Sequence, residues 1–137
     1  MKLLLTLLPL LATLTTADII NNENLKTEVT HAETCTRKTR PGDKVDVHYR
    51  GTLEKDGSEF DASYNRGSPL TFTVGTGQVI KGWDQGLLDM CPGEKRKLTI
   101  QPAWGYGARG AGPIPANAVL VFETELVAIN GQTKDEL

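Results

Sequence analysis

The sequence predicts an α+β domain in which several antiparallel strands surround one short central helix. Apolar and polar residues alternate in several short segments, as they do in strands with one solvated face. Only residues 79–90 space their apolar side chains as a helix does. No β–α–β alternation and no internal repeat occurs, and 137 residues suit a single domain.

The strands are predicted in chain order. The segment "TEVTHAETC" (27–35) comes first, and a turn at "RPGD" separates it from "KVDVHYRGTL" (44–53). In the second segment Val45, Val47 and Tyr49 alternate with polar residues, which is the period of a half-buried strand. A DG hairpin turn follows. Further strands are predicted in "SPLTFTV" (68–74), "KRKLTIQ" (95–101) and "AVLVFETELVAI" (118–129).

The predicted helix carries one apolar stripe. Val79, Trp83, Leu87 and Met90 follow one another at spacings of four, four and three residues. The "PG" dipeptide directly after Cys91 ends the helix. An apolar stripe of this kind is most often plain core.

A pair of glycines, Gly75 and Gly77, precedes this helix and raises the possibility of a phosphate-binding loop. The third glycine of a dinucleotide fingerprint is missing, and the Lys-Ser/Thr ending of a P-loop is absent. We therefore interpret the glycines as a tight strand-to-helix turn. Such a turn exposes a backbone N–H near Ile80 and directs Trp83 inward.

The two ends of the chain carry targeting signals. Residues 1–17 combine a basic start, an apolar run and small residues at the end, as in a secretory signal peptide. The run is too short for a membrane anchor, so no membrane insertion is expected after cleavage. The C-terminal residues form an endoplasmic-reticulum retention signal, although four charged residues could also be a frayed tail. They are Lys134, Asp135, Glu136 and Leu137.

The two cysteines, Cys35 and Cys91, are expected to form a disulfide in the oxidising lumen. A zinc site with His31 and His48 and a redox thiol are the alternatives. The ligand spacing is unlike that of structural zinc sites, and C-x-x-C is absent. The net charge of −2 and the lack of a basic patch argue against nucleic acid as a partner.

Four stretches, "VHYRGTLEKDGSEFDASY", "GTGQVIKGWDQGLLDMCPGEKRKLTI", "GYGARG" and "IPANAVLVFETEL", resemble the FKBP-type peptidyl-prolyl cis-trans isomerases. These are immunophilins that bind tacrolimus and rapamycin. The cysteine positions, the leader and the KDEL ending resemble the lumenal single-domain branch of this family. The chain is thereby divided into a signal peptide (1–17), a flexible segment (18–28), an isomerase domain (29–129) and a tail carrying the retention signal (130–137).

The resemblance implies an antiparallel half-barrel sheet of about five to six strands wrapped around one short helix. It also implies an apolar pocket with Trp83 as its floor. The residues carried over as substrate- or drug-binding are Tyr49, Phe60, Asp61, Arg66, Leu70, Phe72, Val79, Ile80, Trp83, Tyr106, Ile114 and Phe122. Among them, Asp61, Trp83, Tyr106 and Phe122 are the expected catalytic residues. Leu70 and Ala111 depart from the commonest family pattern and make the macrolide affinity uncertain.

Rotation about an X-Pro bond breaks no bond, so neither a nucleophile nor a metal or other cofactor is expected. The Tyr106 hydroxyl and the Ile80 backbone N–H are the candidates to hold substrate carbonyls. Expected partners are proline-containing clients, macrolides and the KDEL receptor, with the protein itself a monomer. The rival interpretation is a lumenal chaperone module that binds Pro-containing segments without catalysing their rotation.

Overall fold

The structure is a computed structural model that describes residues 19–137. The signal peptide predicted for residues 1–17 lies outside this range. The strands are β1 (Leu25–His31), β2 (Lys44–Leu53), β3 (Glu59–Ala62), β4 (Leu70–Thr73), β5 (Lys95–Ile100), β6 (Leu120–Ile129) and β7 (Gln132–Thr133). The helices are α1 (Lys81–Gly86) and the 3₁₀ helices η2 (Ser63–Arg66), η3 (Pro102–Trp104) and η4 (Lys134–Glu136).

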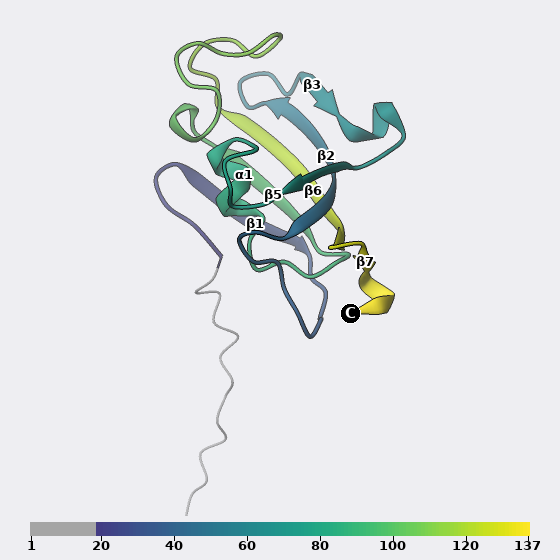
Figure 1. Cartoon of the computed structure of the whole chain (residues 1–137). Coiled ribbons are helices and arrows are strands. Elements are labelled where there is room, and N and C mark those ends of the chain that lie inside the picture. The colour runs from purple at the N-terminus through teal and green to yellow at the C-terminus, as the bar shows by residue number, and fades with distance from the viewer. Residues whose placement is uncertain (1–18) are drawn as a thin grey trace, which may run out of the picture.

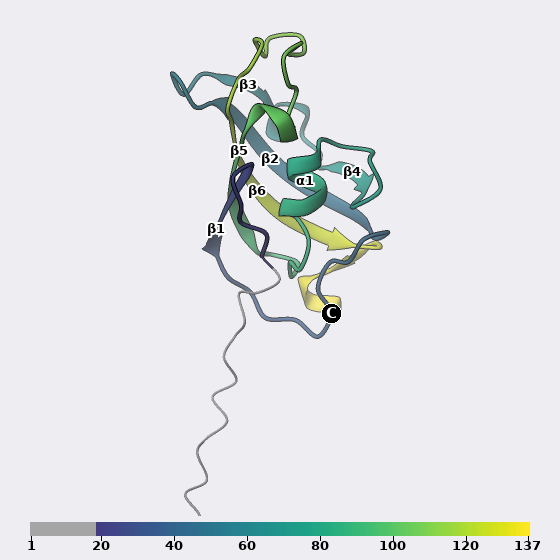
Figure 2. The ribbon, with the colours of Figure 1, turned by 90° about the vertical axis from the view of Figure 1, so that its left-hand side faces the viewer.

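The described residues form one antiparallel sheet that curves around α1 (Figure 1). Its main order is β1-β5-β6-β2-β3, with β4 paired to the first half of β2 and β7 paired to β6. Viewed from the side, α1 packs against one face of the sheet (Figure 2). The predicted α+β class with one short helix inside an antiparallel sheet is confirmed.

The sheet has seven strands within residues 19–137, not five to six as predicted. The additional strands are short: β3 has four residues and β7 has two. Segments of this length contain too few residues to display a period of two. Each pairs with the strand directly before it in the chain, β3 with β2 and β7 with β6.

The N-terminal segment departs from the prediction in two ways. Residues 25–28 belong to β1, although residues 18–28 were predicted to be flexible, and β1 ends at His31 instead of residue 35. Leu25 is almost completely buried against the core. The side chain of Asn22 accepts hydrogen bonds from the backbone of Asn24 and Leu25, so the asparagines form a defined turn.

The helix is also shorter than predicted, because α1 covers only 81–86 of the expected 79–90. Ile80 has extended backbone angles before it, and Asp89 has a positive φ of 61° after it. The buried side chains of Trp83, Leu87 and Met90 nevertheless share one core. The apolar stripe therefore predicted the packing correctly but overestimated the helix length.

The C-terminal tail folds back onto the domain (Figure 1). It forms β7 and η4, and the Lys134 ammonium lies 3.2 Å from a carboxylate oxygen of Glu33. Leu137 packs against the hydrophobic core and is partly buried. Two of the last four residues, Lys134 and Leu137, are thus in contact with the folded domain, and Leu137 is not fully exposed.

Cys35 and Cys91 form a disulfide, with their Cα atoms 5.6 Å apart. This outcome matches the predicted pairing and leaves no thiol in residues 19–137 for the alternative zinc or redox roles. The bond ties the segment after β1 to the buried turn after α1. No helix in the described part of the chain is long and apolar enough to cross a membrane.

Candidate functional site

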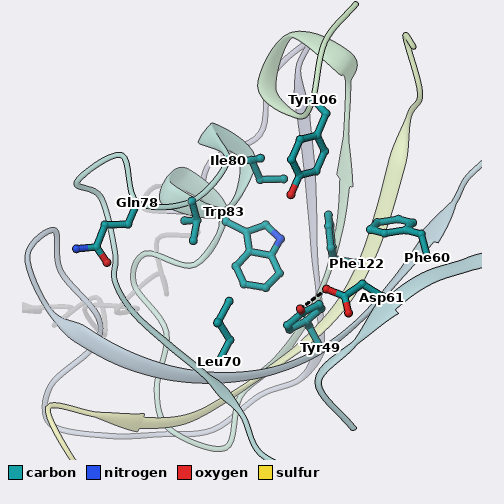
Figure 3. A pocket seen from close by; sticks show the side chains of 10 residues that line it. Tyr49, Phe60, Asp61, Leu70, Gln78, Ile80, Trp83, Tyr106 and Phe122 are labelled. Atoms are coloured by element: carbon teal, nitrogen blue, oxygen red, sulfur yellow. Dashed lines mark hydrogen bonds between the residues drawn. The ribbon is translucent and has the colours of Figure 1, made fainter. Parts of the chain in front are cut away.

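A cavity of about 290 Å³ opens between α1 and the concave side of the sheet. Its lining comes from β2, β3, β4, the turn before α1, α1 itself, the loop after η3, and β6. Figure 3 shows that these side chains converge on one space. The lining residues are Tyr49, Phe60, Asp61, Leu70, Gln78, Val79, Ile80, Trp83, Tyr106 and Phe122.

Trp83 forms the floor of this pocket (Figure 3). Its indole is 4% exposed and meets Tyr49 edge to face, with ring centroids 4.9 Å apart and planes at 79°. Phe122 approaches the indole in a similar way. Edge-to-face contacts of this kind are the preferred geometry of aromatic pairs. The floor is therefore rigid, because the neighbouring rings fix its orientation.

The indole Nε1 of Trp83 is buried and has no hydrogen-bond partner among the described residues. Buried donors normally find an acceptor within the fold, so the Nε1–H of Trp83 is unusual in being an unpaired donor at the pocket floor. In Figure 3 the nitrogen lies on the side of the indole nearer Phe122.

Gly51 on β2 lets two aromatic walls come close to the backbone. A Cβ atom at this position would lie 2.6 Å from the Phe60 ring and 2.8 Å from the Phe122 ring. These two rings meet edge to face at 5.5 Å. Any larger residue at position 51 would push both rings into the pocket. Sequence reasoning did not single out this glycine, because it lies within an otherwise regular strand.

One corner of the pocket carries charge. The Tyr49 hydroxyl donates to the Asp61 carboxylate, and Arg66 donates to the other oxygen of Asp61 at 2.7 Å. Arg66 also donates to the Tyr49 hydroxyl oxygen at 2.6 Å. The three groups form a closed network at the pocket edge. The network holds the Tyr49 ring in the orientation that walls the floor.

The electrostatics of this corner keep Asp61 ionised. Partial burial acts to raise the pKa of Asp61, but hydrogen bonds from Tyr49 and Arg66 outweigh it and hold the pKa below its usual range. Burial and the neighbouring Asp61 raise the pKa of Tyr49. Burial, with a smaller effect of Asp61, also raises the pKa of Tyr106. At neutral pH both tyrosines are therefore hydroxyl donors beside a carboxylate.

The turn that carries Val79 and Ile80 is anchored by Asp84 of α1. The backbone N–H groups of Gly75 and Gly77 donate to its two carboxylate oxygens at 2.8 and 2.9 Å. Both glycines have positive φ angles, 76° and 82°, which glycine adopts without strain. The glycine pair thus binds a carboxylate of the protein itself, in agreement with the prediction that it is a strand-to-helix turn.

Comparison with known proteins agrees with this geometry. Residues 35–127 match the family described as FKBP-type peptidyl-prolyl cis-trans isomerase. The chain belongs to this family.

Individual relatives of this FKBP-type chain are similar over most of its length. FK506-binding protein 2 of Aspergillus oryzae is 64% identical over 132 residues, 96% of this chain and 95% of the relative. FK506-binding protein 1A of Neurospora crassa is 61% identical over 115 residues, 83% of this chain and 95% of the relative. The crystal structure of AtFKBP13 aligns with a TM-score of 0.70 at 40% identity, covering 76% of this chain and 91% of that chain.

In this FKBP-type domain, nine of the twelve residues predicted to bind substrate or drug line the pocket. The remaining three are Arg66, Phe72 and Ile114. Arg66 lies behind Tyr49 and Asp61 and acts on the pocket through them. Phe72 is buried beside the indole, with ring centroids 5.6 Å apart, and Ile114, in the loop after η3, belongs to the hydrophobic core.

Gln78 lines the pocket but was not predicted. Its amide oxygen accepts a hydrogen bond from the backbone N–H of Thr73 at 2.9 Å, which joins the turn before α1 to β4. The signal was present in the sequence, because Gln78 stands directly between Gly77 and Val79. The prediction omitted it because the pocket residues carried over from the family resemblance did not include this position.

Proposed function

We propose that this FKBP-type chain accelerates rotation about X-Pro bonds of client polypeptides in the lumen of the endoplasmic reticulum, by binding the twisted amide in the pocket over Trp83. The observation that carries the proposal is a cavity of about 290 Å³ in which five of the ten lining side chains are aromatic, with the Tyr106 ring and hydroxyl directed over the floor (Figure 3). The aromatic walls suit an apolar ring such as that of proline.

The chemistry requires only that the pocket favour a conformation. Amide resonance sets a rotation barrier of about 18–20 kcal/mol, which makes uncatalysed X-Pro isomerisation take tens of seconds. The twisted amide has lost its conjugation and is less dipolar than the planar form, so an environment with little water favours it. Each tenfold acceleration requires about 1.4 kcal/mol of preference for the twisted form.

Polar groups at the rim would orient the substrate. The neutral Tyr106 hydroxyl, whose pKa is raised by burial, donates a hydrogen bond to a substrate carbonyl. The backbone N–H of Ile80 comes just before α1, where N–H groups have no intrahelical acceptor, and holds a second carbonyl. Asp61 keeps Tyr49 in place and presents a negative charge to the rotating amide.

The relatives named FK506-binding proteins support binding of macrolides such as tacrolimus and rapamycin at the same pocket. Leu70, 37% exposed, lines the pocket, and Ala111 lies in the loop after η3, which also carries the pocket residue Tyr106. Both are small for contacts with a large ring. We therefore expect macrolide binding, with an affinity that Leu70→Phe increases.

The lumenal location is supported by the leader pattern in residues 1–17 and by the KDEL ending. A KDEL receptor is the expected partner of the tail. Expression of the full chain in a secretory cell tests this assignment. We expect the wild type to remain intracellular and a chain truncated after Thr133 to appear in the medium, whereas equal secretion of both would contradict a retention role.

The test of the activity is cis-to-trans isomerisation of an X-Pro peptide by residues 18–137, with and without rapamycin. Acceleration that rapamycin abolishes supports the isomerase proposal. A folded chain that binds rapamycin without accelerating the rotation supports the alternative of a non-catalytic module for Pro-containing segments. A folded chain that does neither overturns both assignments of the pocket.

A further inference from the structure

The two groups assigned to hold substrate carbonyls come from different segments of the chain. Ile80 ends the turn before α1, whereas Tyr106 belongs to the loop after η3. They face the same space from one side of the pocket (Figure 3). Their relative position sets the separation of the two hydrogen bonds that a substrate can make. A contact between the two segments would fix this separation.

The direct neighbours of these groups are in contact. The Lys81 ammonium lies over the Trp104 ring, 4.9 Å from its centroid. Lys81 follows Ile80 in the chain, and Trp104 is separated from Tyr106 by one glycine. A lysine ammonium within about 6 Å of an indole centroid is attracted by the electrons of the ring.

Trp104 is a firm partner for this contact. It is partly buried against the hydrophobic core, and its backbone N–H donates to the Gln101 carbonyl at 2.9 Å. The N–H groups of Gly105 and Gly107 both donate to the Pro102 carbonyl, at 3.0 and 2.9 Å. The backbone on both sides of Tyr106 is thereby tied to the turn that carries the Trp104 ring.

The rest of the loop after η3 is held mainly by bonds within itself. Ala111 and Ile114 exchange backbone hydrogen bonds, and the N–H of Asn117 donates to Gly107. Within residues 19–137, no hydrogen bond or ion pair joins residues 102–117 to residues 75–86. The contact between Lys81 and Trp104 is therefore the polar link between the two sides of the pocket.

We propose that Lys81 and Trp104 are positioning residues that fix the distance between the Ile80 N–H and the Tyr106 hydroxyl through their cation–π contact. The inference rests on the proposed isomerase function. Neither side chain lines the pocket. Both act through their neighbours, so their loss weakens substrate and macrolide binding without removing any contact that the ligand makes.

A double-mutant cycle tests this proposal. The variants are Lys81→Met, Trp104→Leu and the double variant, with Lys81→Arg as the conservative replacement and Lys95→Met as the control for loss of an exposed lysine. Methionine keeps the aliphatic stem of lysine but not its charge. The measurements are KM and kcat for an X-Pro peptide, the Kd for rapamycin and the melting temperature.

We expect Lys81→Met to lower kcat/KM and to weaken rapamycin binding about two- to fivefold, the effect of a partly exposed cation–π contact. The loss should appear in KM with kcat nearly unchanged, because both groups hold the substrate throughout the reaction. Lys81→Arg restores wild-type values. Lys81→Met has no further effect once Trp104 is leucine, and the melting temperature of Lys81→Met equals that of Lys95→Met.

Additive effects of Lys81→Met and Trp104→Leu, or a Lys81→Met variant with wild-type kinetics and rapamycin affinity, would overturn the inference while leaving the proposed function intact. A wild-type chain without isomerase activity and without rapamycin affinity would overturn the proposed function itself. Since Lys81 is exposed, its variants test the proposal even where Trp104→Leu lowers the stability of the domain.

Discussion

The Trp83 indole and the Phe122 ring meet edge to face, with centroids 5.2 Å apart and planes at 83°. Trp83 comes from α1 and Phe122 from β6, so this contact joins the helix to the sheet at the pocket floor. The same two rings are core residues and pocket walls. Stability and ligand binding are consequently coupled at this position.

Replacement of Trp83 by alanine is expected to lower the free energy of unfolding by about 3–5 kcal/mol, because a large buried side chain is lost and a cavity is left. Rapamycin binding should be lost with it. Urea denaturation measures the stability. Tyr64, which is 58% exposed, provides a control: Tyr64→Ala should change the free energy of unfolding by less than about 1 kcal/mol. Equal effects of the two substitutions would contradict a floor role for Trp83.

Asp61→Asn should lower isomerase activity about tenfold, which corresponds to about 1.4 kcal/mol. The amide has nearly the same shape but cannot balance the charge of Arg66 or hold Tyr49 as strongly. Asp56→Asn is the matched control, because Asn-Gly suits its hairpin turn as well as Asp-Gly does. An Asp61→Asn enzyme with full activity would show that the carboxylate charge is dispensable.

The pH dependence follows from the same network. The pKa of Asp61 in the folded protein lies below its ordinary value of 3.8, so its contribution to stability is fully present above that value and is lost as the pH falls through the lower folded-state pKa. The Asp61-dependent part of rapamycin affinity should therefore be constant between pH 5 and 8 and decline only under strongly acidic conditions. Fluorescence titration at several pH values measures it, and a decline near pH 6 would assign the effect to another group.

Arg96→Leu is expected to destabilise the domain by about 3–5 kcal/mol, because it leaves a buried charge unpaired. Arg96 is 2% exposed and donates to the backbone carbonyls of Gly86 and Leu88 at 2.9 and 2.7 Å. It also pairs with the carboxylate of Glu94, which is itself buried. Arg96→Lys should recover little of the loss, since an ammonium cannot reproduce the planar fork of donors. Full recovery in a denaturation experiment would contradict this account.

Reduction of the disulfide should lower the free energy of unfolding by about 4 kcal/mol, the chain-entropy value for a loop of this length. The two cysteines are 56 residues apart in the sequence, and the chain has no others, so a reductant acts on this bond alone. Neither cysteine lines the pocket. The folded fraction should therefore keep its rapamycin affinity, and a loss of affinity without unfolding would show that the bond shapes the site.

Much of this molecule could be predicted from short-range patterns. Alternation identified β2 and β6, because each strand has one buried and one more exposed face over ten residues. The stripe through Trp83 identified the helix, and the glycine pair identified the turn before it. The resemblance to known isomerases then named nine residues that the structure brings together around the cavity. None of these steps required knowledge of which segments become neighbours.

The errors have one physical origin. β3 and β7 are too short to show a period of two. The start of β1 has the polar composition of a loop, although Leu25 packs against the hydrophobic core. Gly51 lacked a local signal of function. In each case the decisive contact is made with another segment of the chain, whereas side-chain periodicity reports only which face of a segment is buried.

The class of fold followed from the sequence alone, and the resemblance to known isomerases predicted the aromatic character of the pocket. Periodicity, end signals and residue type are local properties of a chain and can be read without coordinates. Only the tertiary structure decided that Arg66 acts through Tyr49 and Asp61, that Lys134 pairs with Glu33, and that Lys81 covers Trp104. These contacts depend on chain segments brought together by burial of the common core, and no pattern within either segment specifies its partner.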